Sequence, residues 1–254
     1  MSSIEYKVRV AAELIAESKH VIAFTGAGIS AESGVPTFRG KNGLWTRVDP
    51  MKYASVHGFI ANIREAWAWY KWRMEVIKRA EPNPGHYALA EMEHLGVLKA
   101  VITQNVDRLH QRAGSRNVVE LHGTLWVLRC IDPSCRYRVG IDEPPEEVPP
   151  LCPLCRSPLR PSVVFFGEEL PQSEWARAVE LARRSDLVLV IGTSGVVYPA
   201  AYIPLIVRDS GGAIIDINPD RDAYSGTADL YIQGRAGEVL PRIVERVRKL
   251  VERS

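Results

Sequence analysis

Residues 21–31, Val-Ile-Ala-Phe-Thr-Gly-Ala-Gly-Ile-Ser-Ala, contain the pattern that decides the fold. A short apolar run ends in Gly26-Ala27-Gly28-Ile29-Ser30-Ala31, which matches the form G-x-G-x-x-G/A. In nucleotide-binding α/β domains the first glycine of this form makes a tight turn, and the second lets the backbone approach a pyrophosphate. The phosphates then lie at a helix N-terminus, where free N–H groups favour anions. The stretch therefore predicts a strand, a phosphate-binding turn and a helix. A plain strand-to-helix turn is the alternative.

Similar apolar runs recur at 97–103, 187–191 and 213–217, each rich in Val and Ile and closed by polar residues or glycine. Parallel strands that are covered on both faces have this composition. Apolar residues at helical spacing occupy 8–18, 172–184 and 237–252. Strands that alternate with helices predict an α/β fold with a Rossmann-like, doubly wound parallel sheet.

Two segments interrupt this alternation and predict a small inserted domain. Residues 45–79 are rich in aromatic residues and are expected to be helical, whereas 129–160 contains all four cysteines and a run of prolines. We expect residues 1–44, 80–125 and 162–254 to form the large nucleotide-binding domain. Residues 45–79 and 126–161 would form the small domain, a helical module with a zinc ribbon. The prolines, which lie between the two cysteine pairs, are expected to form a loop: Pro144, Pro145, Pro149 and Pro150.

Composition is that of an ordinary globular protein, with 254 residues, 46% hydrophobic residues and a formal net charge of +2. This charge gives no whole-surface attraction to nucleic acid. No apolar run is long enough to span a bilayer, and the N-terminus, Met1 to Arg9, lacks the apolar core of a signal peptide. We therefore expect a cytoplasmic protein without a membrane partner. Its cysteines would stay reduced, which favours metal binding over disulfides.

The cysteines form two pairs, Cys130-x4-Cys135 and Cys152-x2-Cys155, separated by 16 residues. Two such pairs are typical of zinc ribbons. Four thiolates complete a tetrahedron and leave no position for water. The spacing therefore predicts one structural zinc ion and no catalytic metal.

The sequence lacks one residue that is expected in a nucleotide-binding dehydrogenase. An acidic residue is expected about 20 residues after the glycine loop, at the end of the second strand, to hold the ribose. Asp49 has nearly that spacing but follows no strand, and Thr37-Phe38-Arg39-Gly40 lies there instead, in what we expect to be a flexible functional loop. This difference argues against hydride transfer.

The run from Gly26 to Gly40, Gly-Ala-Gly-Ile-Ser-Ala-Glu-Ser-Gly-Val-Pro-Thr-Phe-Arg-Gly, closely resembles the signature of the sirtuins, a family of NAD-dependent lysine deacylases. Further sirtuin-like motifs follow in the family's order, with the cysteine pairs between the histidine motif and Phe-Gly-Glu. They are Thr103-Gln104-Asn105-Val106-Asp107, Leu121-His122-Gly123, Val164-Phe165-Phe166-Gly167-Glu168, Gly192-Thr193-Ser194 and Asn218-Pro219. The resemblance spans Val21 to Glu238.

The resemblance implies that NAD, as co-substrate, and an acyl-lysine peptide meet in a cleft between the two domains. The acyl oxygen would attack the ribose carbon that carries nicotinamide, and a ribose hydroxyl would then attack the alkylamidate. Nicotinamide would leave as the alkylamidate forms, and water would complete the release of lysine and O-acyl-ADP-ribose. Acyl-lysine proteins are the implied partners, and a chromatin-associated target remains open.

The resemblance also assigns roles to particular residues. His122 would be the general base, a role that suits an imidazole, and Asn105 would act beside it. Without the resemblance, a lone histidine at a strand end is usually structural, and Asp107 could simply cap a helix. The expected NAD-binding residues are Gly26, Ala27, Gly28, Ser30, Thr37, Phe38, Arg39, Trp45, Gln104, Asn105, Val106, Asp107, Gly192, Thr193, Ser194, Asn218, Pro219, Asp220 and Ala236. Val164, Gly167 and Glu168 resemble the segment that clamps the peptide by main-chain hydrogen bonds.

Tyr70 and Arg73 indicate which acyl group the protein removes. They lie three residues apart and would share one helix face, where a hydroxyl and a guanidinium together can bind a carboxylate. The pair resembles the sirtuin class that removes succinyl and malonyl groups, and Ala54 resembles the small residue that leaves room for a longer acyl chain. Alternatively, the aromatic residues are core and Arg73 lies on a solvated face. Acetyl-lysine would also be accepted.

Three rival functions remain at this point. A dehydrogenase would change the absorbance of the nicotinamide, whereas a sirtuin would release it. ADP-ribosyl transfer to protein shares the first chemical step and differs in its product. A non-enzymatic zinc ribbon would bind DNA in a salt-dependent manner.

Overall fold

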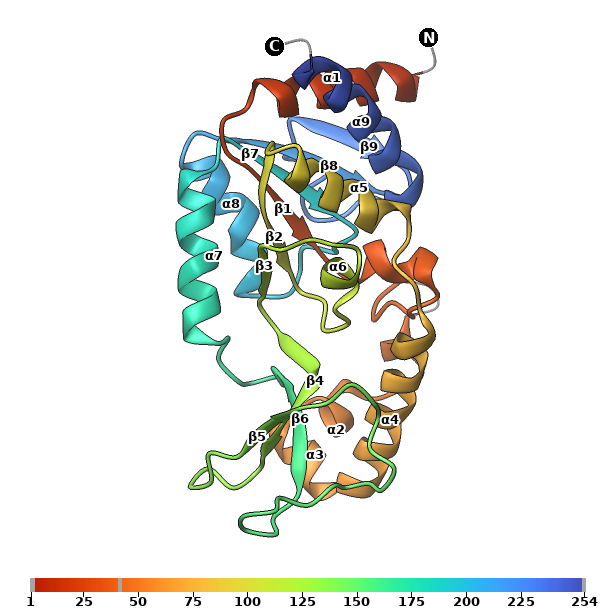
Figure 1. The fold of residues 1–254 in the computed structure, drawn as a ribbon, viewed down its shortest axis with the longest axis vertical. Helices are drawn as coiled ribbons and strands as arrows, with labels where there is room; N and C mark the ends of the chain where they lie inside the picture. Colours follow the sequence, from red (N-terminus) through yellow and green to blue (C-terminus); the bar gives the residue numbers. More distant parts are fainter. Residues whose placement is uncertain (1–2, 41–42, 253–254) are drawn as a thin grey trace.

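The computed structural model describes residues 3–40 and 43–252, and Figure 1 shows their arrangement. The helices are α1 (Ser3–Glu17), α2 (Pro50–Tyr53), α3 (Val56–Ala61), α4 (Ile63–Arg79), α5 (Pro84–His94), α6 (Leu109–Arg112), α7 (Gln172–Arg184), α8 (Ile203–Asp209) and α9 (Ala236–Val251). The strands are β1 (Val21–Thr25), β2 (Leu98–Thr103), β3 (Val118–Glu120), β4 (Gly123–Cys130), β5 (Arg138–Gly140), β6 (Leu159–Val163), β7 (Leu187–Ile191), β8 (Ala213–Asn218) and β9 (Leu230–Gln233). Three short 3₁₀ helices are η1 (Ala27–Ser33), η2 (Leu44–Thr46) and η3 (Ala200–Tyr202).

The large sheet has six strands in the order β3-β2-β1-β7-β8-β9, and all of its pairings are parallel. From β1 the chain first builds outward through β2 and β3, and it returns to add β7, β8 and β9 on the other side. The strand order therefore reverses between β1 and β7. In open α/β sheets, ligands bind outside the carboxyl ends of the strands at such a switch point.

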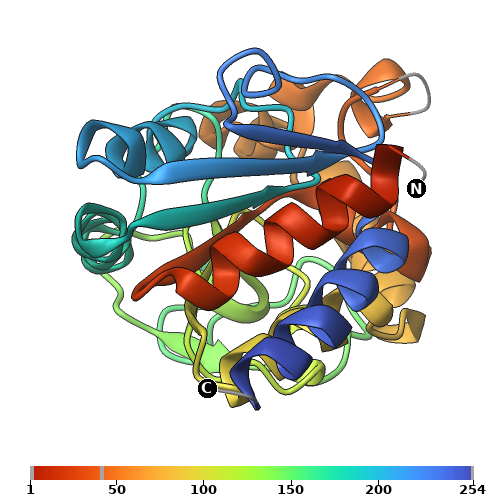
Figure 2. The ribbon, with the colours of Figure 1, turned by 90° about the horizontal axis from the view of Figure 1, so that it is seen from above.

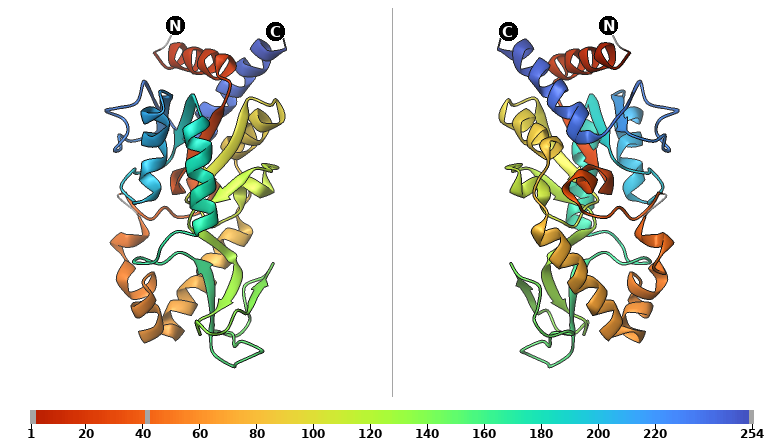
Figure 3. Two further views of the ribbon diagram at one scale, coloured as in Figure 1. Left: turned by 90° about the vertical axis from the view of Figure 1, so that its left-hand side faces the viewer. Right: turned by 90° about the vertical axis from the view of Figure 1, so that its right-hand side faces the viewer.

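Helices cover both faces of this sheet. Val21 and Ala23 of β1 belong to the same apolar cluster as residues of α1, α5 and α9, whereas Ile22 and Phe24 pack with α7 and α8. This alternation is the period of two expected for a strand whose faces are both buried. Figure 2 shows α1 and α9 lying across one face of the sheet, and Figure 3 shows α7 and α8 on the other.

The smaller unit combines an antiparallel sheet, in the order β5-β4-β6, with helices α2, α3 and α4. In Figure 1 it lies below the large sheet. Helix α4 is its main support: Trp67 is fully buried, and its indole Nε1 donates to the carbonyl of Leu159 on β6 at 2.8 Å. Because a buried indole N–H needs a partner, this bond fixes how α4 packs on the sheet.

Most of the predicted elements are present. The runs at 97–103, 187–191 and 213–217 correspond to β2, β7 and β8, and the helix predicted at 172–184 is α7. The helix predicted after the glycine loop is corrected to η1, a 3₁₀ helix of seven residues. Here Gly34 at φ +81° ends the segment, so a full α-helix does not develop.

The predicted loop at Pro144–Pro150 follows β5, and it is fastened to α4 by Lys71, whose Nζ donates to the carbonyl of Glu146. The proposed domain boundaries at 125 and 161 fall inside β4 and β6, which connect the two units. The division into two domains stays a prediction. Within the described part of the chain, no helix is long and apolar enough to cross a membrane.

Candidate active site

A cleft of about 830 Å³ opens at the carboxyl ends of β1, β2, β7 and β8, where the large sheet faces the small unit. Its walls come from segments far apart in the sequence, including the glycine loop, the loop after β2 and the aromatic face of α4. A cleft of this size accommodates a dinucleotide together with part of a second substrate. The fold therefore brings the separate sequence motifs to one place.

Two glycines make the phosphate-sized end of the cleft. The amide of Gly28 donates to the carbonyl of Gly192, at 2.8 Å, so the turn after β1 lies directly on the turn after β7. A Cβ atom at Gly28 would lie 2.6 Å from the Cα of Gly192. Gly192 itself has φ +58°, a conformation that favours glycine. Backbone contact at the switch point therefore requires glycine at both positions.

Asn105 is held at the mouth of β2 by three bonds. Its amide Nδ2 donates to the carbonyl of Gly26 at 3.1 Å and to Oγ of Ser30 at 3.2 Å, and its backbone amide donates to Oγ1 of Thr103. Ser30 in turn donates to Oδ2 of Asp107 at 2.8 Å. Burial raises the pKa of the Asp107 carboxyl, and the hydrogen bonds from the Leu109 amide and from Ser30 only partly offset this rise.

Ser30 and Asp107 therefore lie behind the cleft wall. Both are buried, and the other predicted NAD and substrate residues line the cleft itself. Oδ1 of Asp107 also accepts the amide of Leu109 at the start of α6, although the N-cap residue of that helix is Arg108. Ser30 and Asp107 are therefore placed to orient Asn105, and their own contact with NAD stays a prediction.

His122 lies at the junction of the large sheet and β4. Its Nδ1 is 3.1 Å from the carbonyl oxygen of Gln104. A carbonyl only accepts, so Nδ1 carries the proton and Nε2 keeps its lone pair. Burial lowers the pKa of His122, although the bond to Gln104 works in the opposite direction. The imidazole is therefore neutral near pH 7 and has the protonation state that a general base needs.

Two further histidines form a buried layer that the sequence did not single out. His86 and His110 stack edge to face with ring centroids 5.0 Å apart. Nε2 of His110 lies 2.9 Å from Oγ1 of Thr25, while Nε2 of His86 lies 3.4 Å from Oγ of Ser30. Burial lowers the pKa of His86 to about 4 and holds that of His110 well below its usual range. Both rings are neutral supports of the cleft wall.

The adenosine-sized end of the cleft lies beyond β8. Asn218, Pro219 and Asp220 line it, and Ala236 contributes from the start of α9. Glu32, which the sequence did not predict, lines the same region and accepts the amide of Gly237 at 2.7 Å. The sequence lacks the acidic residue that holds the ribose in dehydrogenases, and Asp49 does not replace it, because the Asp49 carboxylate caps α2. Asn218 occupies the strand end instead.

The segment predicted from the sequence to bind the peptide follows β6. The amide of Val164 donates to the carbonyl of His122 at 2.9 Å, and the amide of Phe166 donates to the carbonyl of Ala54 at 2.7 Å. Gly167 lines the cleft. Glu168 has a different environment from the other members of this segment, because its carboxylate accepts from Arg160, from Arg129 and from the amide of Phe165. It is therefore an anchor of the segment.

An aromatic cage surrounds Arg73 at the other end of the cleft. Its guanidinium carbon lies 4.7 Å from the ring centroid of Phe38, 4.8 Å from that of Trp69 and 6.0 Å from that of Tyr70. Arg73 is 8% exposed and Tyr70 is 1% exposed, and both line the cleft together with Ala54. The alternative of a solvated face is therefore wrong for Arg73. The loop residues Thr37 and Arg39 and the ring of Trp45 complete this wall.

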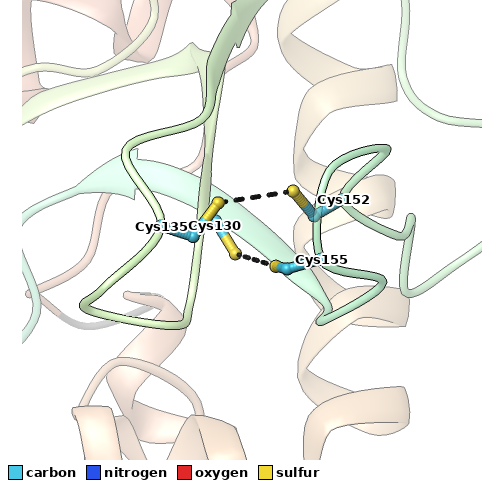
Figure 4. Close-up of side chains that lie close together, drawn as sticks. All are labelled: Cys130, Cys135, Cys152 and Cys155. Atoms are coloured by element: carbon cyan, nitrogen blue, oxygen red, sulfur yellow. Dashed lines mark hydrogen bonds between the residues drawn. The ribbon is translucent and has the colours of Figure 1, made fainter.

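The four cysteines converge at the tip of the small sheet (Figure 4). All four sulfur atoms lie within 4.8 Å of one another, with 3.4 Å between Cys130 and Cys155 and 3.7 Å between Cys135 and Cys152. A zinc ion bound at about 2.3 Å by four thiolates needs sulfurs at this separation. The donor set is therefore suited to one structural zinc ion, and it is remote from the cleft residues.

Several residues that line the cleft carry no signal in the sequence alone. Trp69, Val197 and Arg235 belong to this group, whereas Phe166, which also lines the cleft, lies within a motif quoted from the sequence. Their positions depend on how α4, β6 and the loop after β7 come together. Val164-Phe165-Phe166-Gly167 could have indicated Phe166, because it adjoins two predicted residues.

The comparisons agree with this geometry. The Sir2 family model matches residues 26–199. NAD-dependent protein deacylase 2 of Pyrobaculum aerophilum is 59% identical over 94% of this chain and 95% of its own length. The crystal structure of a Sir2 homologue in complex with NAD is 52% identical, covers 94% of this chain and 93% of that one, and gives a TM-score of 0.90. Sir2Af2 bound to a myristoylated histone peptide is 41% identical over 98% and 100% of the two chains, with a TM-score of 0.81.

These matches establish an α/β enzyme that uses a nicotinamide dinucleotide. The chain belongs to the Sir2 family and is an NAD-dependent protein deacylase.

Proposed function

We propose that this deacylase removes acidic acyl groups, succinyl and malonyl, from protein lysines, and that it also removes acetyl groups. One observation carries the acidic preference. The guanidinium of Arg73 is buried against the cleft, and among residues 3–40 and 43–252 it has no carboxylate within salt-bridge distance. Burial lowers the pKa of Arg73, although Tyr70 and Asp107 partly offset this effect.

A buried cation without a hydrogen-bonded partner is costly, whereas a carboxylate that pairs with it removes that cost. The guanidinium offers two parallel donors that match a carboxylate. The Tyr70 hydroxyl would add a third donor, because burial raises its pKa and keeps it protonated. Ala54, with its small side chain at the cleft wall, leaves space for an acyl chain longer than acetyl.

In this proposal the cleft residues share the reaction. The backbone of Gly26, Ala27 and Gly28 would hold the phosphates, and Asn218 would bind the adenosine ribose. Asn105, oriented from behind by Ser30, would bind the nicotinamide and ribose end. Nε2 of His122 would accept a proton from a ribose hydroxyl as that hydroxyl attacks the alkylamidate. Nicotinamide would already have left when the alkylamidate formed, and water would then hydrolyse the intermediate to O-acyl-ADP-ribose and free lysine.

The substrate is proposed to be an acyl-lysine segment of a protein, bound in extended form beside Val164 and Gly167. Sir2Af2, a structural neighbour, binds a myristoylated histone peptide. Chromatin-associated proteins are therefore among the targets that we propose for this chain.

The test uses one peptide sequence with acetyl-, malonyl-, succinyl- or succinamoyl-lysine, the last being a neutral isostere of succinyl. Products of reactions with NAD are identified by mass spectrometry. Arg73→Met should lower kcat/KM for succinyl-lysine by about 100-fold, the equivalent of one lost bidentate charged pair. It should change kcat/KM for the acetyl and succinamoyl peptides by less than about threefold.

Arg79→Met is the matched control, because Arg79 lies on the same helix but is exposed. It should leave every rate unchanged. Equal losses on the acetyl and succinyl peptides in Arg73→Met would contradict the selective role. ADP-ribosylated protein in place of O-acyl-ADP-ribose would overturn the deacylation chemistry that we propose.

A further inference from the structure

The amide of Asn218 has a single orientation that is compatible with its surroundings. Its Nδ2 lies 2.9 Å from the carbonyl oxygen of Thr193 and 2.9 Å from Oδ2 of Asp222. Both neighbours are acceptors, so the nitrogen must face them and both of its hydrogens are used. Within the described residues, no hydrogen bond reaches Oδ1 of Asn218. That oxygen is left as an acceptor at the cleft that Asn218 lines.

Asp222 is itself held by several donors. Its Oδ1 accepts from the amide of Tyr224 at 2.8 Å, from the amide of Ser225 at 3.0 Å and from Oγ of Ser225 at 3.1 Å. Three donors on one oxygen leave the other oxygen for Asn218. The loop after β8 therefore fixes the carboxylate, and the carboxylate fixes the amide.

Ser225 connects Asp222 to a second, fully buried carboxyl group. Oγ of Ser225 lies 2.7 Å from Oδ2 of Asp216, and it accepts the amide of Asp222 at 2.9 Å. A hydroxyl has one proton and two lone pairs. Ser225 can satisfy both carboxyl groups only if Asp216 is protonated and donates to Oγ, because Oγ can then donate to Asp222.

We propose that Asp222 is a positioning residue for NAD, which holds the Asn218 amide so that Oδ1 accepts a hydroxyl of the adenosine ribose, and that Asp216 controls this hold through Ser225. The proposal rests on the role of Asn218 proposed above. It adds the chemical form of the contact, since only a ligand hydroxyl that donates can use Oδ1.

The surroundings of Asp216 favour the protonated form. Burial, followed by the nearby Asp222 carboxylate, raises the pKa of Asp216 to about 7, and the hydrogen bond from Ser225 only partly offsets these effects. The other titratable groups that face it are the phenols of Tyr224 and Tyr231, whose own pKa values are raised by burial. On β7, its register partner is the apolar Val190.

The sign of the pH effect follows from the proton count. When Asp216 loses its proton, Ser225 turns its single hydrogen to the nearer carboxylate, and Asp222 loses one donor while gaining a neighbouring charge. The hydrogen bond by which Asp222 orients the Asn218 amide should weaken as pH rises through about 7. The KM for NAD should therefore rise by about fivefold between the two states, while kcat at saturating NAD stays constant.

Three variants test this coupling in the full-length enzyme with acetyl-lysine peptide, with circular dichroism melting to verify folding. In Asp222→Asn, the two backbone amides and the Ser225 hydroxyl that now donate to Oδ1 of Asp222 should bind the oxygen of the new side-chain amide. Its nitrogen would then face Nδ2 of Asn218, and the Asn218 amide would have to turn. KM for NAD should rise about tenfold, with kcat and the peptide KM unchanged. Asp216→Asn should keep KM for NAD low and independent of pH. Ser225→Ala should raise KM for NAD and weaken its pH dependence, because only the direct effect of the Asp216 charge on Asp222 remains.

NAD analogues that lack the 2′- or the 3′-hydroxyl of the adenosine ribose complete the test. The wild type should discriminate against one of them, and Asp222→Asn should discriminate about tenfold less. Undiminished discrimination would overturn the proposal, as would wild-type behaviour of Ser225→Ala, which would indicate that Asp222 touches NAD directly. If Asn218→Ala itself left the KM for NAD unchanged, the role of Asn218 in the proposed function would fail instead.

Discussion

The ion pair between Arg160 and Glu168 should control the stability of the segment after β6 that we propose binds the peptide. Nη1 and Nη2 of Arg160 donate to the two oxygens of Glu168 at 2.8 and 2.9 Å, and Nη2 also donates to the carbonyl of Val163 at 2.7 Å. The guanidinium carbon lies 3.5 Å from the ring centroid of Phe165. One side chain thus ties the end of β6 to the loop that follows it.

Arg160→Met removes this tie. Breaking a buried pair costs about 3–5 kcal/mol. The Arg160 side chain is 7% exposed, but that of Glu168 is 22% exposed and keeps its bond from Arg129, so we expect about 3 kcal/mol. For a chain of this size that corresponds to a fall in Tm of about 6–12 °C. The KM for the peptide should also rise, because Val163 and Phe165 flank Val164, which we propose lies beside the bound peptide.

Denaturant unfolding followed by tryptophan fluorescence, together with peptide titrations, measures both effects. Arg129→Met is the matched control: its side chain is 39% exposed and makes one bond to the same carboxylate, so it should cost at most about 1 kcal/mol. A loss in Arg160→Met no larger than the loss in Arg129→Met would refute the reasoning.

The same pair predicts a pH dependence of stability. Burial raises the pKa of Glu168, but hydrogen bonds from Arg160 and the amide of Phe165 outweigh it, so the pKa lies below its ordinary value. A lowered pKa in the folded state adds stability above the unfolded pKa, and this contribution is lost as pH falls through the folded pKa. Glu168→Gln should be less stable than the wild type near pH 7, and the difference should shrink under acid conditions. A constant difference across the pH range would contradict the linkage.

Three other predictions concern the active site and the metal site. His122→Ala should lower kcat by at least about 100-fold. In the wild type, kcat should fall only at pH values below the ordinary pKa range of histidine, because burial lowers the pKa of His122. A pH profile of kcat whose acid limb lies above pH 7 would argue against His122 as the base. Gly28→Ala should abolish NAD binding in calorimetry, since its Cβ would lie 2.6 Å from the Cα of Gly192, whereas Gly226→Ala, with nothing within 4 Å, should bind normally. Cys130→Ser should lose one equivalent of zinc in metal analysis and unfold the small sheet first, and full zinc content in that variant would count against a four-cysteine site.

The large sheet was predictable because its signals are local. Buried parallel strands appear as short apolar runs, and the two cysteine pairs define their metal by spacing alone. The helix after the glycine loop was not predictable in the same way. The sequence there permits a helical turn, but tight contact with Gly192 across the switch point and the left-handed Gly34 restrict it to η1.

The environment of charged side chains was the least predictable feature. Arg73, Arg160 and Arg129 are the same residue type, yet their side chains differ in burial and in hydrogen-bond partners. Arg73 lies among aromatic rings and faces the cleft, while Arg160 donates to Glu168 and to the carbonyls of Pro161 and Val163. Only the packing of α4 against β6 decides between a ligand-binding cation and a structural one.

Family resemblance identifies residues but does not say in which layer of the site each one lies. Ser30, Asn105 and Asp107 all belong to the signature motifs, yet only Asn105 lines the cleft. They form one chain of hydrogen bonds, in which Asn105 donates to Ser30 and Ser30 donates to Asp107. Residues that act as such a unit show strongly non-additive effects on rate. Removing Ser30 should therefore cost nearly as much as removing Ser30 and Asp107 together, because either change removes the same bond from the Asn105 amide and leaves only its bond to Gly26.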